Sequence, residues 1–269
     1  MFMAELPVLY IPHGGGPCFF MDWTMGPPDT WQRMADWLRG VPELLGSIPK
    51  AALVISGHWE EEPVAVTSHP SPPLLYDYYG FPEHTYQLKY AAPGLPALAR
   101  RVGELLTEAA FPVKEDPARG FDHGVFIPFK LIYPQADIPI VQLSLRAGLD
   151  AGAHIRIGRA LAALRREGVL IVGSGMSFHN LRAFGPAAGP PSDQFDEWLT
   201  NAVCAADAER RNNELEAWKH APAARLAHPR EEHLLPLMVA AGAAENQQGR
   251  KLFQDRVMGA TVSAFGFGL

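Results

Sequence analysis

Short apolar runs recur along the chain and are separated by longer stretches of mixed polarity. Val8-Leu9-Tyr10-Ile11 is the first such run, and Leu53-Val54-Ile55 forms the centre of the second. Runs of this length, rich in branched and aromatic residues and bounded by Gly or Pro, are typical of buried strands. We predict strands at 8–11, 51–56, 64–67, 138–145, 169–174 and 259–267.

Between these runs, apolar residues recur at helical spacing, as Trp31, Met34 and Leu38 do. Alternation of strands and helices favours a mostly parallel, mixed sheet with helices on both faces. We therefore predict an α/β fold with three layers, α/β/α. No linker or repeat divides the chain, which predicts one domain over residues 1–269. The predicted helices are 29–39, 96–109, 151–167, 192–218 and 231–241.

Composition narrows the function without assigning it. The 269 residues are 48% hydrophobic and 19% charged, which is ordinary for a globular protein with a sizeable core. A formal net charge of -6 argues against a nucleic-acid partner. No apolar run approaches the length needed to cross a membrane. We therefore expect a small-molecule substrate, no nucleic acid and no membrane partner.

The N-terminal residues do not resemble a signal peptide. With only two cysteines, Cys18 and Cys204, we expect reduced thiols and a cytoplasmic protein. Neither cysteine has the spacing of a zinc site. The sequence leaves monomer and homodimer open.

Three histidines follow apolar runs closely. His13 opens the segment Pro12-His13-Gly14-Gly15-Gly16-Pro17, and His58 and His179 come after the runs at 51–56 and 169–174. Ligands bind at the carboxyl edge of open α/β sheets. Imidazole is the commonest metal ligand, so several imidazoles at one edge predict a mononuclear metal site. The rival interpretation of the glycine run, a phosphate-binding loop, lacks the lysine and spacing of a Walker motif.

Two further histidines stand in turn-like or helix-start contexts. His123 follows Asp122, which either orients a neighbouring ring or caps the next helix. His233 follows Glu231 and Glu232, two carboxylates that suit a helix N-terminus by charge alone. His228 is an outside candidate because it lies near His233. The remaining histidines, His69, His84, His154 and His220, have surroundings that predict no functional role.

The five histidines lie in five short motifs, which are His-Gly-Gly-Gly-Pro, Ser-Gly-His-Trp, Phe-Asp-His-Gly, Ser-Phe-His-Asn and Glu-His-Leu-Leu-Pro-Leu. Taken in this order, the motifs resemble those of the class III (LigB-type) extradiol ring-cleavage dioxygenases, and in particular the 4,5-DOPA dioxygenase extradiol branch. The resemblance runs from about residue 7 to the C-terminus and includes Tyr79-Gly80-Phe81-Pro82 and Tyr90-Ala91-Ala92-Pro93-Gly94.

The resemblance implies a LigB-like fold and a role for each histidine. His13, His58 and His233 would be metal ligands, although Glu232 competes with His233 for the third position. His179 would be the acid-base residue and would become a fourth ligand when substrate is absent. His123 would orient the substrate from behind the ligands.

The implied reaction is extradiol cleavage. Fe(II) would bind an ortho-diphenol such as L-DOPA or caffeate, and O₂ would open the ring to a muconate semialdehyde-type product. Zinc would be an alternative metal in the isolated protein. Trp59, Tyr79 and Phe126 are candidates for contacts with the aromatic ring, together with Tyr78 and Phe81. A substrate carboxylate would need a cation, and Arg146 and Arg182 are equal candidates.

Two other functions fit parts of the pattern. A zinc hydrolase would use three histidines and a water, with a fourth imidazole as general base. A binding protein of this fold would keep the pocket but would have no need of His123 and His179. The sequence does not distinguish the catechol or the side of the diol that is cleaved.

Overall fold

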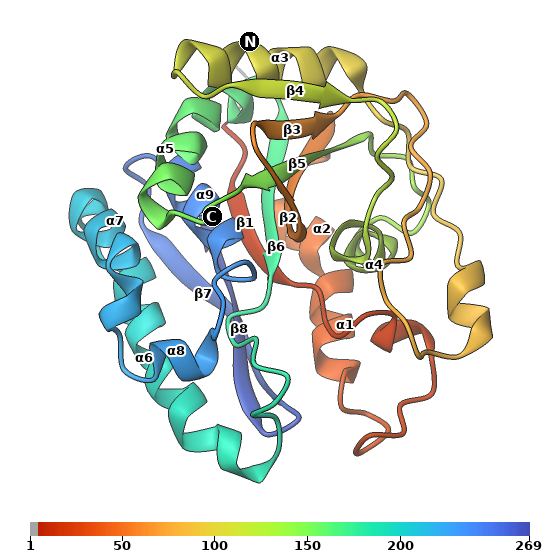
Figure 1. Ribbon diagram of the computed structural model, residues 1–269, viewed down its shortest axis with the longest axis vertical. Helices are drawn as coiled ribbons and strands as arrows, with labels where there is room; N and C mark the ends of the chain where they lie inside the picture. The colour runs from red at the N-terminus through yellow and green to blue at the C-terminus, as the bar shows by residue number, and fades with distance from the viewer. Residues whose placement is uncertain (1–4) are drawn as a thin grey trace.

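The computed structural model describes residues 5–269, which form one eight-stranded mixed sheet with helices on both faces (Figure 1). The predicted α/β class is therefore confirmed. The strand order is β4-β3-β5-β2-β6-β1-β8-β7. The strands are β1 Val8–Pro12, β2 Ala51–Glu61, β3 Val64–Thr67, β4 Val113–Asp116, β5 Ile140–Arg146, β6 Val169–Gly175, β7 Gly249–Val257 and β8 Ala260–Phe267.

The centre of the sheet is parallel and its ends are mixed. β2 pairs in parallel with β5 and β6, and β6 pairs in parallel with β1. β8 is antiparallel to both β1 and β7. β1, β2 and β6 are buried along almost their whole length, as expected for strands covered on both faces. Their carboxyl ends therefore meet at one edge of the sheet.

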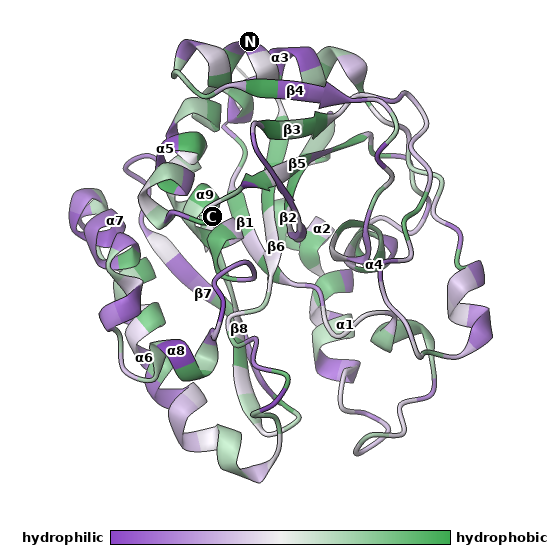
Figure 2. Ribbon diagram, viewed as in Figure 1, coloured by the Kyte–Doolittle hydropathy of each residue, from purple (hydrophilic) through white to green (hydrophobic). Residues whose placement is uncertain are grey.

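Two groups of helices cover the sheet. α5, α6, α7 and α9 lie on one side, and α1, α2 and α4 lie on the other (Figure 1). Figure 2 shows that the central helix α9 is hydrophobic, whereas the peripheral α7 is mainly hydrophilic. The α-helices are α1 Gln32–Arg39, α2 Val41–Leu45, α3 Pro96–Glu108, α4 His123–Ile132, α5 Ala151–Leu161, α6 Gly189–Val203, α7 Ala208–Glu216, α8 Ala224–Ala227 and α9 Leu235–Ala243.

Several predicted boundaries were wrong for identifiable reasons. The single helical region predicted at 192–218 is two helices, because the side chain of Asp207 accepts a hydrogen bond from the backbone N–H of Arg210 and starts α7 afresh. The helix predicted at 231–241 begins only at Leu235, with Pro236 in its first turn. α4, β4 and β7 were missed. α4 is continuously apolar and contains Pro128, so it has no amphipathic period.

No helix in residues 5–269 combines the length and apolar character needed to span a bilayer. Cys18 and Cys204 are free thiols, as predicted.

The C-terminal end of α9 depends on a buried arginine. The Arg211 guanidinium donates to the carbonyls of Ala241 (2.9 Å), Glu245 (2.8 Å) and Gln247 (2.5 Å). The side chain is fully buried, and burial lowers the pKa of Arg211 to about 10. Arg211 therefore satisfies carbonyls that the end of the helix leaves without partners.

We expect Arg211→Met to lower the free energy of unfolding by about 2–4 kcal/mol, because three carbonyls, including that of the buried Ala241, would lose the donor that Arg211 provides. Urea unfolding followed by circular dichroism measures this effect. Arg210→Met is the matched control, since Arg210 is exposed and pairs only with Glu214. Equal losses in the two variants would contradict the role assigned to Arg211.

Candidate metal centre and active-site cavity

His13 lies immediately after β1 at the carboxyl edge of the sheet. Its backbone N–H donates to the carbonyl of Gly175 at the end of the neighbouring β6 (3.2 Å). Gly14 then turns the chain with φ of +81°, a conformation that favours glycine. A Cβ on Gly14 would also lie only 2.5 Å from the Cys18 sulfur. The glycine run therefore serves to turn the chain away from His13.

His58 lies inside β2 rather than after it. The pairing of β2 with β5 is irregular between Ile55 and Glu60, so the strand continues past the point where the apolar run ends. Such irregularities change the direction in which side chains point and are common beside active sites. The irregular segment carries His58 at the sheet edge.

His233 lies in the turn before α9, and its backbone is held on two sides. Its carbonyl accepts hydrogen bonds from the Tyr10 hydroxyl (2.8 Å) and from the backbone N–H of Met176 (3.2 Å). A Cβ on Gly175 would overlap this carbonyl oxygen, so only glycine allows the turn to lie so close to β6. The turn is thereby fixed against β1, which leads to His13, and against the end of β6.

The imidazoles of these three residues face one another through Nε2. The Nε2 atom of His58 lies 3.3 Å from that of His13 and 3.2 Å from that of His233. Two nitrogens that share one ion at about 2.0–2.1 Å lie roughly 3.0–3.4 Å apart at ordinary coordination angles. Both distances therefore suit ligands of a common metal.

The opposite nitrogen of two of these rings contacts a hydrogen-bond acceptor. Nδ1 of His13 lies 3.0 Å from the carbonyl oxygen of Gly14, and Nδ1 of His233 lies 2.9 Å from Oε1 of Glu232. Nδ1 of His58 lies 3.7 Å from Oδ2 of Asp77. Metal-binding histidines usually donate their second N–H to such an acceptor, which leaves Nε2 as the lone-pair nitrogen. Glu232 therefore contacts His233 at Nδ1, on the side of the ring opposite to the Nε2 atom that faces His58.

Burial keeps these rings in the state that a metal requires. Burial lowers the pKa of His13, His58 and His233 well below the usual value, and the neighbouring imidazoles lower it further. Metal ions bind the neutral form of imidazole. The donor set therefore fits a divalent ion that accepts nitrogen ligands.

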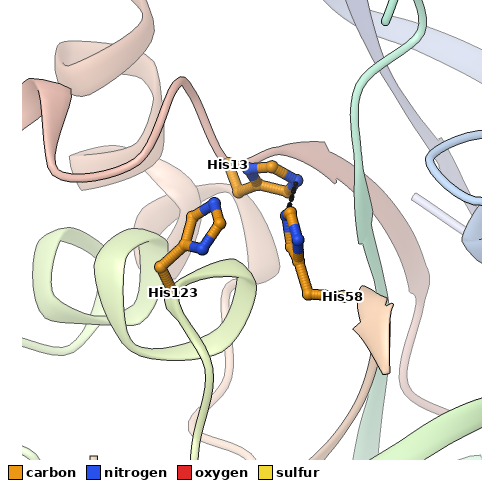
Figure 3. A group of neighbouring side chains, drawn as sticks. All are labelled: His13, His58 and His123. Atoms are coloured by element: carbon orange, nitrogen blue, oxygen red, sulfur yellow. Dashed lines mark hydrogen bonds between the residues drawn. The ribbon is translucent and has the colours of Figure 1, made fainter. Parts of the chain in front are cut away.

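His123 joins this group from α4. The donor atoms of His13, His58 and His123 lie within 4.8 Å of one another, and Figure 3 shows their rings gathered from three different elements. Asp77 holds His123 by accepting from its Nδ1 (2.8 Å) and from its backbone N–H (2.9 Å). Burial alone would raise the pKa of Asp77, but the hydrogen bonds from His123 together with the charge interactions with His123 and His58 outweigh this effect, and the net pKa is lowered. Asp77 is therefore an anionic partner shared by two histidines.

His179 lies on the other side of His233. The two rings stack at 3.4 Å between centroids, with 19° between their planes. Nδ1 of His179 lies 3.3 Å from Oε1 of Glu232, and the donor atoms of His179, Glu232 and His233 form a second close group. The His179 side chain keeps 22% of its surface exposed, against 4% for His233. His179 is thus the more accessible of the two stacked rings.

Asp122 does not orient a histidine, nor does its side chain cap α4. Its carboxylate accepts from the Ser56 hydroxyl (2.8 Å) and from the Gln142 amide, and Arg119 lies 3.3 Å away. These contacts tie the start of α4 to β2 and β5. Asp122 therefore supports the helix that carries His123.

A cavity of about 410 Å³ opens beside the histidines. Tyr78, Tyr79 and Phe81 line it, with Tyr79 90% exposed at the mouth. Trp59 and Phe126 are buried and are not among the residues that line it. The Trp59 ring instead lies beneath the Arg119 guanidinium. Of the five aromatic candidates predicted to contact substrate, the structure therefore brings Tyr78, Tyr79 and Phe81 to the cavity, but not Trp59 or Phe126.

The remaining histidines lie away from this cavity. His228 is buried but is directed at the carbonyl of Ser177 (3.0 Å), and His154 contacts the backbone of Asp150 and Arg146. His69, His84 and His220 are exposed. Sequence reasoning missed Asp77 and the cavity walls Trp23 and Trp31. An acid within the aromatic segment Leu74–Phe81 was the only available signal for Asp77.

We expect Asp77→Asn to weaken metal affinity about 10–100-fold, because the substitution removes the charge behind His58 and His123. Competition with a chromogenic chelator measures the affinity. Asp36→Asn serves as the control, since Asp36 is an exposed aspartate paired with Arg39. Unchanged affinity in Asp77→Asn would show that the carboxylate does not support the site.

Comparison with known proteins places this site in a family. Residues 7–267 match the model described as the catalytic LigB subunit of aromatic ring-opening dioxygenase. A 4,5-DOPA dioxygenase extradiol of Beta vulgaris is 42% identical over 219 residues, covering 80% of this chain and 81% of that protein. Dioxygenase tasH of Hapsidospora irregularis is 36% identical over 285 residues, covering 99% and 86%. A crystal structure of an uncharacterized protein from Escherichia coli K12 covers 98% of this chain and 100% of that one, with a TM-score of 0.76 and 31% identity.

The fold and the imidazole cluster define a ring-opening dioxygenase of the LigB class. The chain belongs to the LigB family, and its relatives named 4,5-DOPA dioxygenase extradiol indicate an extradiol dioxygenase. The family resemblance predicted from the five histidine motifs is thereby confirmed.

Proposed function

We propose that this protein is a non-haem Fe(II) dioxygenase that opens the ring of an ortho-diphenol beside its two hydroxyls. The observation that carries the proposal is the contact of the His58 Nε2 with the Nε2 atoms of His13 and His233 at the base of an aromatic cavity. Three protein ligands leave coordination positions free for substrate and dioxygen. We further propose that residues 1–269 make up a single catalytic domain.

The metal would be held by His13, His58 and His233. When bound, iron would mediate electron transfer from the diphenol to dioxygen, which otherwise reacts poorly with a closed-shell aromatic ring. Nitrogen ligands also suit zinc, which exceeds Fe(II) in the usual affinity order, so we expect zinc to compete in the isolated protein. The neutral, buried state of the three rings suits either ion.

His179 would move the protons of the reaction. One substrate hydroxyl must lose a proton, and oxygen–oxygen cleavage requires an acid. A histidine can supply both functions near neutral pH. His179 lines the cavity, and Glu232, at 3.3 Å from its Nδ1, would hold the ring in place. His123, anchored through Asp77, would form a hydrogen bond with a substrate hydroxyl through its Nε2 from the other side of the site.

The aromatic walls would hold the substrate ring. The Tyr78 ring packs edge-on against His123, with 5.8 Å between centroids. The Tyr78 hydroxyl donates a hydrogen bond to the carbonyl of Thr85. Tyr78 therefore presents its ring to the cavity. Phe81 packs edge-on against Tyr78 at 5.6 Å. A planar catechol could stack on either ring.

The test is anaerobic reconstitution with Fe(II), followed by oxygen uptake and visible absorbance with a panel of catechols that includes L-DOPA and caffeate. We expect oxygen uptake together with a new yellow product. No uptake with any catechol at stoichiometric iron would reject the proposal and favour a zinc hydrolase.

A further inference from the structure

Apart from the histidines, the described residues that line the cavity have neither acidic nor basic side chains. Among the residues that the structure describes, none of its lining side chains is Lys, Arg, Asp or Glu. Beyond the histidines and the three glycines after His13, the lining is aromatic or aliphatic. It includes Trp23, Trp31, Phe81, Met176, Phe184 and Met258.

The mouth of the cavity is apolar as well. Met25 is 60% exposed, Tyr79 90% and Leu181 73%, and all three line the opening. Exposed apolar side chains gathered at one place on a soluble surface commonly mark a binding site. The route into the cavity therefore favours an apolar group over a hydrated ion.

The arginines nearest the cavity are engaged elsewhere. Beyond the wall formed by Phe184 and Met258, Arg33 pairs with Asp255 at 2.6 Å, and Arg256 pairs with Asp193 at 2.8 Å. Both candidates for a substrate carboxylate also lie outside. Arg146 pairs with Glu62, and Arg182 lines a neighbouring surface depression that shares His179 and Leu181 with the cavity.

Two carboxylates lie close to the site, and the arginines beside them, Arg119 and Arg230, are engaged in ion pairs outside the cavity. Asp77 lies behind His58 and His123, and Glu232 lies behind His179 and His233. An anionic substituent on the substrate would lose its hydration without gaining a cationic partner, and it would face these two carboxylates. An apolar substituent would lose no hydrogen bonds on entering.

We propose that the substrate is a catechol whose ring substituent is uncharged and apolar, rather than an amino acid such as L-DOPA or an acid such as caffeate. The inference rests on the proposed ring-opening function and concerns only the group attached to the diphenol ring.

The test compares two catechols of equal chain length on the Fe(II)-loaded protein. 4-Propylcatechol has an uncharged tail, and 3-(3,4-dihydroxyphenyl)propanoate ends in a carboxylate. We expect kcat/KM to be about tenfold or more higher for 4-propylcatechol. L-DOPA should be as poor as the acid. Anaerobic calorimetric titration should show the same order in Kd.

A positive charge introduced at the mouth of the cavity tests whether the lack of a cationic side chain causes the discrimination against the acid. We expect Leu181→Arg to raise the ratio of kcat/KM for the acid to kcat/KM for 4-propylcatechol about two- to fivefold, the range of an exposed ion pair. Leu181→Gln is the control, since it is polar but uncharged. Leu181 is largely exposed, so both variants should fold.

The outcomes separate the two proposals. If both catechols are opened and the acid is used as well as or better than 4-propylcatechol, the substituent inference is overturned while the ring-opening function stands. If neither catechol consumes oxygen at full iron content, the proposed function fails, and this inference fails with it.

Discussion

Replacing His58 by alanine is expected to abolish tight metal binding and reduce ring opening to background. Its Nε2 is the atom that lies within 3.3 Å of Nε2 of both His13 and His233, so its loss removes the central donor of the set. Loss of a residue that only supports a ligand typically costs about 10–100-fold in metal affinity. We expect a larger loss for His58→Ala, which would remove a ligand itself.

Metal analysis after anaerobic loading and desalting measures the effect, together with oxygen uptake on the best catechol. His220→Ala is the matched control, because His220 is an exposed histidine far from the cavity. It should keep full metal content and activity. Wild-type iron content in His58→Ala would reject the ligand role of His58. Metal analysis of His13→Ala and His233→Ala would then show whether those two residues hold the metal without it.

The parallel core of the fold was predictable because burial on both faces leaves an unmistakable pattern. β1 and the first halves of β2 and β6 are apolar runs, and the carboxyl ends of these strands define the edge where the site forms. β7, Gly249–Val257, escaped prediction because it is an edge strand of mostly polar and half-buried residues. Its strand character comes from hydrogen bonds to β8 and not from its own apolar pattern.

The candidate ligands were predictable as residues but not as an arrangement. His13 follows its apolar run directly, so its place at the sheet edge follows from the strand. His233 reaches the same place only because Tyr10, Met176 and Gly175 hold its turn against β6. Such contacts join residues more than fifty positions apart, and no local pattern reveals them.

The partners of the histidines were hardest to predict. Asp77 belongs to a long segment with little regular structure, so neither periodicity nor a strand end indicated its direction. Asp122, adjacent to His123 in sequence, was a candidate for orienting a histidine ring. Its carboxylate instead accepts hydrogen bonds from Ser56 and Gln142. Adjacent residues at a helix start point in different directions, and tertiary packing decides which of them reaches the site.

His179→Ala is expected to keep its metal and to lose ring-opening turnover by about 10²–10⁴-fold, the usual contribution of a general acid-base residue. His179 lines the cavity and stacks on the face of His233, while the close Nε2 contacts of His58 are with His13 and His233. Its removal should therefore leave the three-histidine set intact. Metal content and kcat, measured on the same preparation, test both halves of this expectation.

Rescue by added imidazole distinguishes proton transfer from a structural role. The His179 side chain is partly open to solvent, so imidazole can enter the space left in His179→Ala and restore part of kcat, with a pH dependence set by the added base. His228→Ala is the contrasting variant, because His228 is fully buried and its contact is with the carbonyl of Ser177. Its defects should be in stability and should not respond to imidazole. Nearly full activity in His179→Ala would remove the residue from the reaction. Loss of metal matching that of His58→Ala would instead make His179 a fourth ligand of the resting site.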